Sequence, residues 1–194
     1  MFQVRIHGRG GQGVVTAAEL LADAAFDEGK FAQAFPSFGS ERTGAPVVAF
    51  TRISDTPIRV REPIMTPDAL IVQDETLLRA IDVFSGLNPD GYVLINSTLS
   101  FSELDLGEYS HAKARFMTVP ATHLAIQHLG RPVPNAVLLG AFAALTGAVT
   151  LKSVNDAIAH RFNAKLAAGN SAAASAAFEY VKSQLQEMSE TSNA

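Results

Sequence analysis

The chain has 194 residues, of which 47% are hydrophobic and 18% are charged, with a formal net charge of −4 and no cysteine. This length and apolar content are sufficient for one well-buried core, and the net negative charge argues against nucleic acid as the main ligand, because a phosphate backbone requires a basic surface. Without cysteine, the chain alone cannot form a disulfide bond, use a cysteine nucleophile or hold an iron–sulfur cluster.

The first 29 residues predict a strand, a glycine-rich turn and a helix. Over residues 2–7, apolar side chains alternate with polar ones, as in a strand. After the sequence GRGGQG of residues 8–13, small and apolar side chains recur at helical spacing as far as Gly29, which is a suitable helix end. A strand therefore leads through a bare stretch of backbone into a helix.

Strands and helices then alternate along the rest of the chain. The expected strands lie at 30–35, 45–53, 56–62, 67–74, 92–96 and 114–120, and the expected helices at 75–84, 121–129, 136–145, 153–162 and 172–186. The adjacent strands 45–53 and 56–62, joined by a turn, predict a local antiparallel hairpin. We therefore expect an α/β fold, a layered Rossmann-like domain with a largely parallel sheet, that hairpin, and C-terminal helices.

No internal repeat or linker divides the sequence, which predicts a single domain over residues 1–187 and a flexible polar tail over 188–194. The helix expected at 136–145 is apolar on every side, which is typical of a helix buried either in the core or in a subunit interface. The low share of charged residues similarly suggests a surface partly covered by partner proteins, although an alanine-rich monomer would have the same composition.

The glycine-rich turn is the strongest local signal for a ligand. Residues 8–13 satisfy the pattern G-x-G-x-x-G between a predicted strand and a predicted helix. Glycines permit positive φ angles, and the N-terminus of the helix offers free N–H donors to an anionic group. A dinucleotide site also needs an acid at the end of the second strand, about 20 residues further on, and residues 35–37 contain none. A free-standing NAD(P)-binding oxidoreductase and a turn that binds nothing both remain alternatives.

Five segments along the chain together resemble one family, the gamma subunit, or the equivalent internal domain, of the 2-oxoacid:ferredoxin oxidoreductases. They are GRGGQGVVTAAELLADAA, PSFGSERTGAPVVAFTRIS, PDALIVQD, VPATHLA and PNAVLLGAFAALTG, and the likeness runs from Val4 to Tyr180. The dipeptide Ala45-Pro46 is similar to the pyruvate type of these enzymes rather than the 2-oxoglutarate type. Ser40 and Thr43 depart from the pyruvate-type pattern, which has proline and arginine at these positions.

This resemblance implies a gamma subunit of a multi-subunit enzyme that decarboxylates pyruvate to acetyl-CoA and passes two electrons to ferredoxin, or runs the reverse reaction. Thiamine diphosphate, Mg²⁺ and the iron–sulfur clusters are then expected on partner subunits of alpha, beta and delta type. This chain is expected to be inactive alone and to contribute to assembly and to the coenzyme A side of the active site; a scaffold subunit that binds no ligand is the alternative. The N-terminus has no secretory signal and no apolar run reaches the length of a bilayer span, so we expect a cytoplasmic location without membrane contact.

Two segments are candidates for contact with a phosphate-bearing ligand, for which the resemblance implies coenzyme A. The candidate residues are Gly8, Gly10, Gly11, Gln12 and Gly13 in the first segment, and Ser37, Phe38, Gly39, Glu41 and Arg42 in the second. The second segment follows a strand end, where open α/β sheets place their ligands. Both also have a structural interpretation, the first as a tight turn and the second as solvated surface charges.

Other polar residues receive structural roles from the sequence. Asn135 is in place to cap a helix, His7 closes a strand, and Asp68, Asp74 and Glu75 flank a strand as turn and cap residues. The remaining histidines show no spacing typical of a metal site. No residue is assigned a catalytic role, and no metal is expected on this chain.

Overall fold

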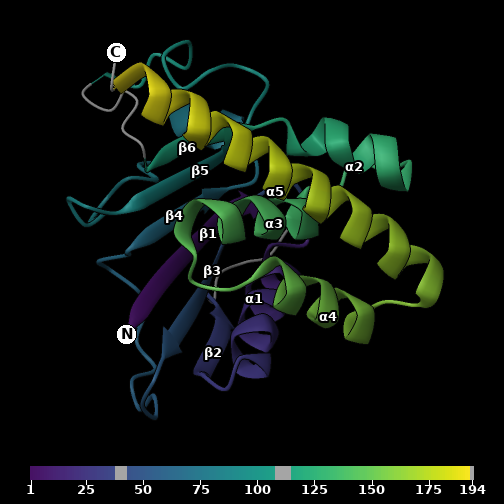
Figure 1. Ribbon diagram of the computed structural model, residues 1–194. Helices are drawn as coiled ribbons and strands as arrows, with labels where there is room; N and C mark the ends of the chain where they lie inside the picture. Colours follow the sequence, from purple (N-terminus) through teal and green to yellow (C-terminus); the bar gives the residue numbers. More distant parts are fainter. Residues whose placement is uncertain (38–42, 108–114, 193–194) are drawn as a thin grey trace.

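A computed structural model describes residues 1–37, 43–107 and 115–192, and it contains one mixed sheet covered by helices (Figure 1). The strands are β1 (Phe2–Arg9), β2 (Phe31–Pro36), β3 (Pro46–Ser54), β4 (Ala69–Val72), β5 (Tyr92–Asn96) and β6 (Phe116–Val119). Their spatial order is β2-β3-β1-β4-β5-β6. Strands β1, β4, β5 and β6 pair in parallel, whereas β3 is antiparallel to both of its neighbours. The predicted α/β class with a largely parallel sheet is therefore confirmed.

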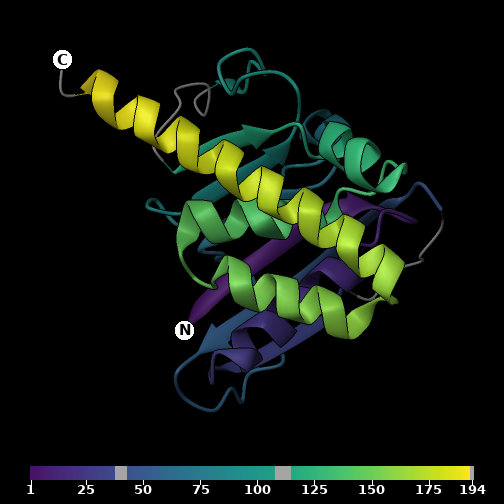
Figure 2. The same ribbon diagram turned by 45° about the vertical axis from the view of Figure 1, so that its right-hand side comes forward.

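The helices lie on one face of this sheet. They are α1 (Val14–Asp27), α2 (Ala121–Leu129), α3 (Asn135–Thr146), α4 (Leu151–Arg161) and α5 (Ala164–Ser192). Figures 1 and 2 both show α5 crossing over α3, which lies between α5 and the sheet. Leu139 of α3 is fully buried in this core. The apolar helix thus packs inside the chain, as the core interpretation of its sequence predicted.

The opposite face of the sheet is covered without long helices. The short 3₁₀ helix η1 (Glu75–Arg79) and irregular segments pack there on the apolar side chains of β4 and β5. The buried Arg5 of β1 fixes these segments by donating to the carbonyl oxygens of Val83 (2.9 Å) and Ser85 (2.5 Å). A guanidinium with several donors can satisfy carbonyl groups that have no strand or helix partner.

The predicted hairpin between 45–53 and 56–62 is wrong in its second strand. Residues 58–62 form no strand, because β3 already pairs with β1 on one side and β2 on the other, which leaves no free edge. Arg52 instead donates to the carbonyl oxygen of Glu62 (2.5 Å). The antiparallel hairpin of this fold is β2–β3, in which Ala34 faces Thr51.

Two helix predictions also need correction. The helix expected at 75–84 is only η1, because the backbone after it bonds in tighter local turns: Val83 N donates to Ile81 O (3.0 Å) and Phe84 N to Asp82 Oδ1 (3.2 Å). The last helix is longer than expected: α5 runs from Ala164 to Ser192, past the domain boundary predicted at 187. The boundary itself stays a prediction. Within the described part of the chain, no helix is both long and apolar enough to cross a membrane.

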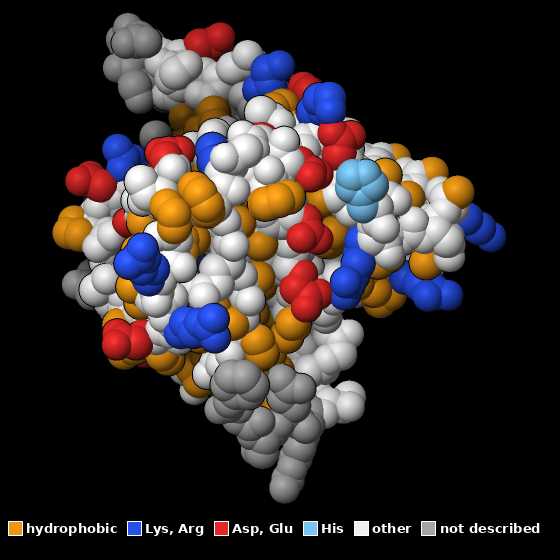
Figure 3. All heavy atoms as spheres, turned by 90° about the horizontal axis from the view of Figure 1, so that it is seen from below, with side chains coloured by type: hydrophobic (Ala, Val, Ile, Leu, Met, Phe, Trp, Pro, Cys, Tyr) orange, Lys and Arg blue, Asp and Glu red, His pale blue; other side chains and the backbone are white. Residues whose placement is uncertain are grey.

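Charged side chains of both signs lie among hydrophobic ones on the face seen in Figure 3. Some large apolar side chains are exposed on the molecule, among them Phe26 (71% exposed) and Phe31 (46%). Such a mixed surface is normal for a soluble domain, and it does not by itself mark an interface.

Glu28 ties the end of α1 to the start of α4. Its carboxylate accepts hydrogen bonds from Thr150 N (2.6 Å) and Ser153 Oγ (2.6 Å) and pairs with Lys30 Nζ (3.2 Å). Burial raises the pKa of Glu28, but the hydrogen bonds from Ser153, Thr150 and Lys30 outweigh it, so the pKa lies below its ordinary value. The ionised form is thus the form that stabilises the fold.

Replacing Glu28 with glutamine is expected to lower the free energy of unfolding by about 1–2 kcal/mol at neutral pH, because a carboxylate at a helix N-terminus is lost. The contribution exists above the ordinary glutamate pKa and disappears as pH falls through the depressed pKa of the folded state. The free energies of unfolding of the wild type and Glu28→Gln, measured by urea denaturation, should therefore converge at acidic pH. Glu179→Gln, on an exposed pair with Lys182, serves as the control and should change little; an equal loss in both variants would contradict this account of Glu28.

Candidate functional site

The glycine-rich segment forms a tight turn between β1 and α1. The N–H of Gln12 donates to the carbonyl oxygen of Arg9 (3.0 Å), which closes the turn. Gly11 and Gly13 have positive φ angles of 94° and 70°, and Gly13 is the N-cap of α1. Side chains rarely tolerate this left-handed backbone, so glycine at these two positions follows from the turn itself.

Several main-chain donors at this turn are available to a ligand. Within residues 1–37, 43–107 and 115–192, the N–H groups of Gly11, Gly13, Val14, Val15 and Thr16 form no hydrogen bond. The first N–H groups of a helix have no partner inside the helix, and they carry its partial positive charge. The turn therefore presents a cluster of donors suited to an anion.

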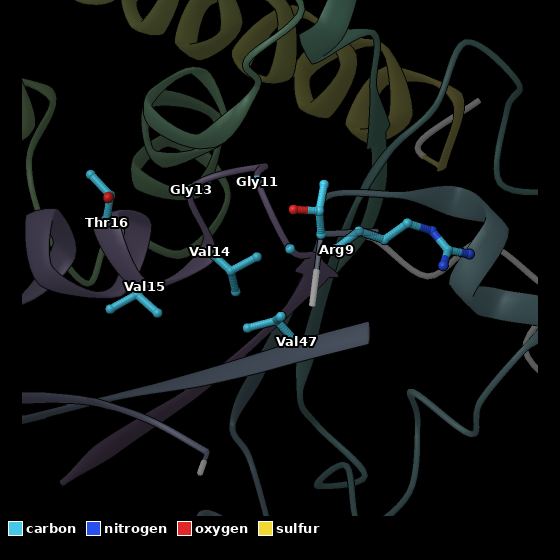
Figure 4. A pocket seen from close by; sticks show the side chains of 9 residues that line it. Arg9, Gly11, Gly13, Val14, Val15, Thr16 and Val47 are labelled. Atoms are coloured by element: carbon cyan, nitrogen blue, oxygen red, sulfur yellow. The ribbon is translucent and has the colours of Figure 1, made fainter. Parts of the chain in front are cut away.

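These donors face a hollow of about 520 Å³ (Figure 4). Its lining residues are Arg9, Gly10, Gly11, Gly13, Val14, Val15, Thr16, Thr43 and Val47. Figure 4 shows the Arg9 side chain pointing away from the valines that surround the hollow. The hollow is thus formed by bare backbone and small side chains, and the Arg9 guanidinium is turned aside.

The chain returns beside the turn at residues 43–45. Gly10 N donates to Ala45 O (2.9 Å) and Gly44 N donates to Gly10 O (3.1 Å), next to a bridge between Gly10 and Thr43. Ser37 is exposed, bonds through its N–H to Val48 O (2.8 Å) and does not line the hollow. The other predicted residues of this segment, Phe38, Gly39, Glu41 and Arg42, lie outside the described residues.

The Gln12 side chain is engaged by the protein itself. Its Oε1 accepts from Arg9 N (2.8 Å), and its Nε2 donates to Asp74 Oδ2 (2.8 Å). Gln12, which the sequence made a candidate for ligand contact, therefore bonds a neighbouring loop. It holds the turn in shape and does not reach into the hollow.

Asp74 is the residue of this site that sequence analysis placed only as a cap. It does cap η1 by accepting a hydrogen bond from Thr76 N (3.0 Å), but it also accepts a hydrogen bond from Gln12 Nε2 and pairs with Arg9 Nε (3.3 Å). Arg9 is held further by Thr76 Oγ1 (2.7 Å) and Gly44 O (3.0 Å). The network joins the turn, the returning segment and η1. The only signal in the sequence is that Asp74 follows the end of a buried strand.

The Asp74 carboxyl is ionised in this network. Burial raises its pKa, but hydrogen bonds from Thr76 and Gln12 and the positive charge of Arg9 outweigh burial, and the pKa lies below its ordinary value. A carboxylate that accepts several hydrogen bonds favours its charged form. Arg9 therefore keeps a charged partner at neutral pH.

Packing also favours glycine at positions 8 and 13 of the turn. A Cβ on Gly8 would lie 2.5 Å from Val14 Cγ2, and one on Gly13 would lie 2.5 Å from Asn135 Nδ2. A Cβ on Gly11 would meet nothing within 4 Å, because Gly11 borders open space. The cap role predicted for Asn135 is wrong, because Pro134 is the N-cap of α3 and Asn135 is its first helical residue. The Asn135 side chain accepts from Ala136 N (2.8 Å), and its Nδ2 approaches Gly13 O (3.5 Å).

His7 lies with Arg5 on the sheet face opposite α1. It is 4% exposed, and its Nε2 accepts from Arg5 Nε (3.1 Å). Burial, with the charge of Arg5, lowers the pKa of His7 to about 3. His7 is therefore neutral and structural. Among the described residues, no three His, Asp or Glu side chains gather as a metal site would require.

The neutral His7 makes the fold sensitive to mild acid. The unfolded chain takes up the proton near pH 6.5 and the folded chain only near pH 3, so stability is full above 6.5 and falls as pH drops toward 3. Between pH 7 and pH 5 we expect a loss of about 2 kcal/mol from this group. Chemical denaturation should show that His7→Gln lacks this loss, while His128→Gln, at an exposed position, retains it. Identical pH profiles for the wild type and His7→Gln would contradict the assignment.

Comparison with known proteins places almost the whole chain in one group. The family model for pyruvate ferredoxin/flavodoxin oxidoreductase matches residues 3–180. The chain is 50% identical over 182 residues to pyruvate synthase subunit PorC of Methanothermobacter marburgensis, covering 94% of this chain and 98% of the relative. It is 47% identical over 188 residues to the pyruvate/ketoisovalerate oxidoreductases common subunit gamma of Pyrococcus abyssi, covering 97% and 100%. The crystal structure of pyruvate oxidoreductase subunit PORC from Thermotoga maritima is similar, with a TM-score of 0.79, 36% identity and coverage of 92% and 95%.

Proposed function

The chain belongs to the pyruvate ferredoxin/flavodoxin oxidoreductase family, and on that premise we propose that it is the gamma subunit of a multi-subunit 2-oxoacid:ferredoxin oxidoreductase acting on pyruvate. The complex converts pyruvate and coenzyme A to acetyl-CoA and CO₂ and passes two electrons to ferredoxin, or runs the reverse reaction. The support is that the relatives carry pyruvate synthase and gamma-subunit names and match over nearly their whole length.

In this proposal the redox groups belong to the alpha-, beta- and delta-type partners. The chain has no cysteine to hold an iron–sulfur cluster. The part of the chain that the structure describes gathers no metal-ligand set for Mg²⁺. Thiamine diphosphate, bound with its metal on a partner, supplies the carbon chemistry. The cytoplasm, where we expect the complex to work, remains a prediction from the sequence.

The contribution of this chain is to bind a phosphate group of coenzyme A at the glycine turn. The observation that carries this assignment is the set of N–H groups at Gly11, Gly13 and the first turn of α1, which border the hollow and have no partner among the described residues. Phosphate oxygens accept hydrogen bonds from such donors, and glycine leaves room for their approach. None of the described lining residues is an acid that would hold a ribose, which disfavours the NAD(P) alternative.

Purification tests the proposed role. When the affinity-tagged chain is purified from its own cells, we expect larger, cluster-bearing subunits to co-purify with it. The complex should oxidise pyruvate with coenzyme A and ferredoxin, and the separated chain should not. Pyruvate oxidation by the separated chain, or saturable binding of NADH or NADPH to it, would count against the gamma-subunit assignment.

A further inference from the structure

A second cleft, of about 490 Å³, begins at Gln12 and lies at the ends of three parallel strands. Strands β4, β5 and β6 lead into it through Gln73, Asn96 and Pro120. The segment after β1, which is α1, covers one face of the sheet, and the segment after β4, which is η1, covers the other. Open α/β sheets bind ligands at such a switch between faces, beyond the carboxyl ends of the strands.

The Gln73 side chain in the lining of this cleft has no partner among the residues that the structure describes. Gln73 is 1% exposed, and neither its Nε2 nor its Oε1 forms a hydrogen bond with any residue that the structure describes. Ser97, also in the lining and 5% exposed, accepts from Leu99 N (3.0 Å) and keeps its hydroxyl proton for another acceptor. Buried polar groups in native proteins nearly always have partners, so an unpaired amide here indicates a missing one.

The character of the cleft differs from that of the glycine-turn hollow. Its charged lining residues are Asp74 and Glu75, with His123 beside them, and the described lining contains no lysine or arginine. Prolines and the half-exposed Ile126 form its apolar part. The Asp74 carboxylate is paired with Arg9, but the guanidinium lies outside the lining and Glu75 adds a second negative charge, so the lining repels an anion more than a neutral group.

We propose that this cleft binds a neutral carboxamide or peptide group through the Gln73 amide, with Ser97 as a second contact. One side chain that offers a donor and an acceptor together is complementary to a group with an acceptor and a donor side by side. The group belongs either to a free amide-bearing compound or to the main chain of a partner. The site is separate from the proposed phosphate site and does not depend on it.

Titration of the ¹⁵N-labelled chain with N-methylacetamide, followed by NMR, tests this site. The Gln73 side-chain amide signal, identified by its loss in Gln73→Met, is expected to shift saturably, whereas acetate and inorganic phosphate leave it in place. Signals of Ser97 and of Thr122, a further lining residue of the cleft, should follow the titration in the wild type and stay unchanged in Gln73→Met. Ser97→Ala, which leaves the Gln73 amide in place, should weaken the binding of N-methylacetamide. It replaces Gln73→Met as the test variant if Gln73→Met does not fold.

Thermal unfolding gives an independent readout. Gln73→Met removes a buried amide without a partner, so the unfolding midpoint is expected to rise by about 2–4 °C. The matched control is Gln33→Met, because the Gln33 amide is already bonded to Arg52 (3.3 Å), and its midpoint should fall. A fall in both variants, no saturable shift, or an equal shift with acetate would overturn the proposal. The same titration of the assembled complex identifies the source of the group. If N-methylacetamide still binds, the group belongs to a free compound; if it no longer binds, the main chain of a partner occupies the cleft.

Discussion

Gly140→Ala is expected to destabilise the chain by at least about 3 kcal/mol, a large part of the stability of an ordinary domain. Gly140 lies in α3 where α5 crosses it. A Cβ at this position would overlap the carbonyl oxygen of Ala174 and lie 2.5 Å from its carbonyl carbon. Both atoms are backbone of a helix, so neither can rotate away as a side chain would. The two helices must separate, and the apolar core between them opens.

Gly147→Ala is the matched control for this prediction. Gly147 ends α3 with a φ of 64°, and a Cβ there would meet nothing within 4 Å. The added methyl group then brings only the strain of the left-handed backbone, about 1–2 kcal/mol. Urea denaturation of the full chain measures both variants. Equal losses would show that the close approach of α3 and α5 is not what requires glycine at 140.

Asp74→Ala is expected to raise the KM for coenzyme A about tenfold in the assembled enzyme, a loss of about 1.4 kcal/mol of binding. Asp74 holds both Gln12 and Arg9, and so fixes the turn whose N–H groups receive the phosphate. Without the carboxylate the turn loses its support, but the reacting groups on the partner subunits are untouched. Binding lost equally in ground and transition states raises KM and leaves kcat unchanged.

The controls for Asp74 separate positioning from general damage. Asp74→Asn keeps an acceptor for Gln12 but loses the charge facing Arg9. Its KM for coenzyme A should therefore lie between that of the wild type and that of Asp74→Ala. Asp156→Ala removes an exposed carboxylate that pairs with Lys152, and it should change neither constant. The KM for pyruvate should stay the same in all variants. A drop in kcat with an unchanged KM for coenzyme A would contradict the positioning role.

Local sequence signals predicted the parts of the fold that depend on local backbone. The turn between β1 and α1 and the helix ends at Gly29 and Gly130 all require positive φ angles, and the glycines in the sequence indicate these positions. The strand expected at 56–62 failed because its absence depends on β1 and β2 occupying both edges of β3, which is a property of the whole sheet. Alternating side chains alone cannot reveal that no edge is free.

The candidate site was predictable to a similar degree. The glycines were found because they are contiguous, whereas Asp74 was missed because it meets Gln12 from 62 residues away. Thr43, which follows the second candidate segment, lines the hollow, whereas Ser37 does not. Contact of Phe38, Gly39, Glu41 and Arg42 with a ligand stays a prediction.

The most direct test of the account is a structure of the assembled enzyme with coenzyme A bound. We predict a phosphate group in the hollow, with its oxygens about 2.7–3.2 Å from the N–H nitrogens of Gly11, Gly13 or Val14. Coenzyme A bound with all its phosphates on other subunits, and the hollow filled by protein or water, would contradict the claim that this turn is the anion-receiving element.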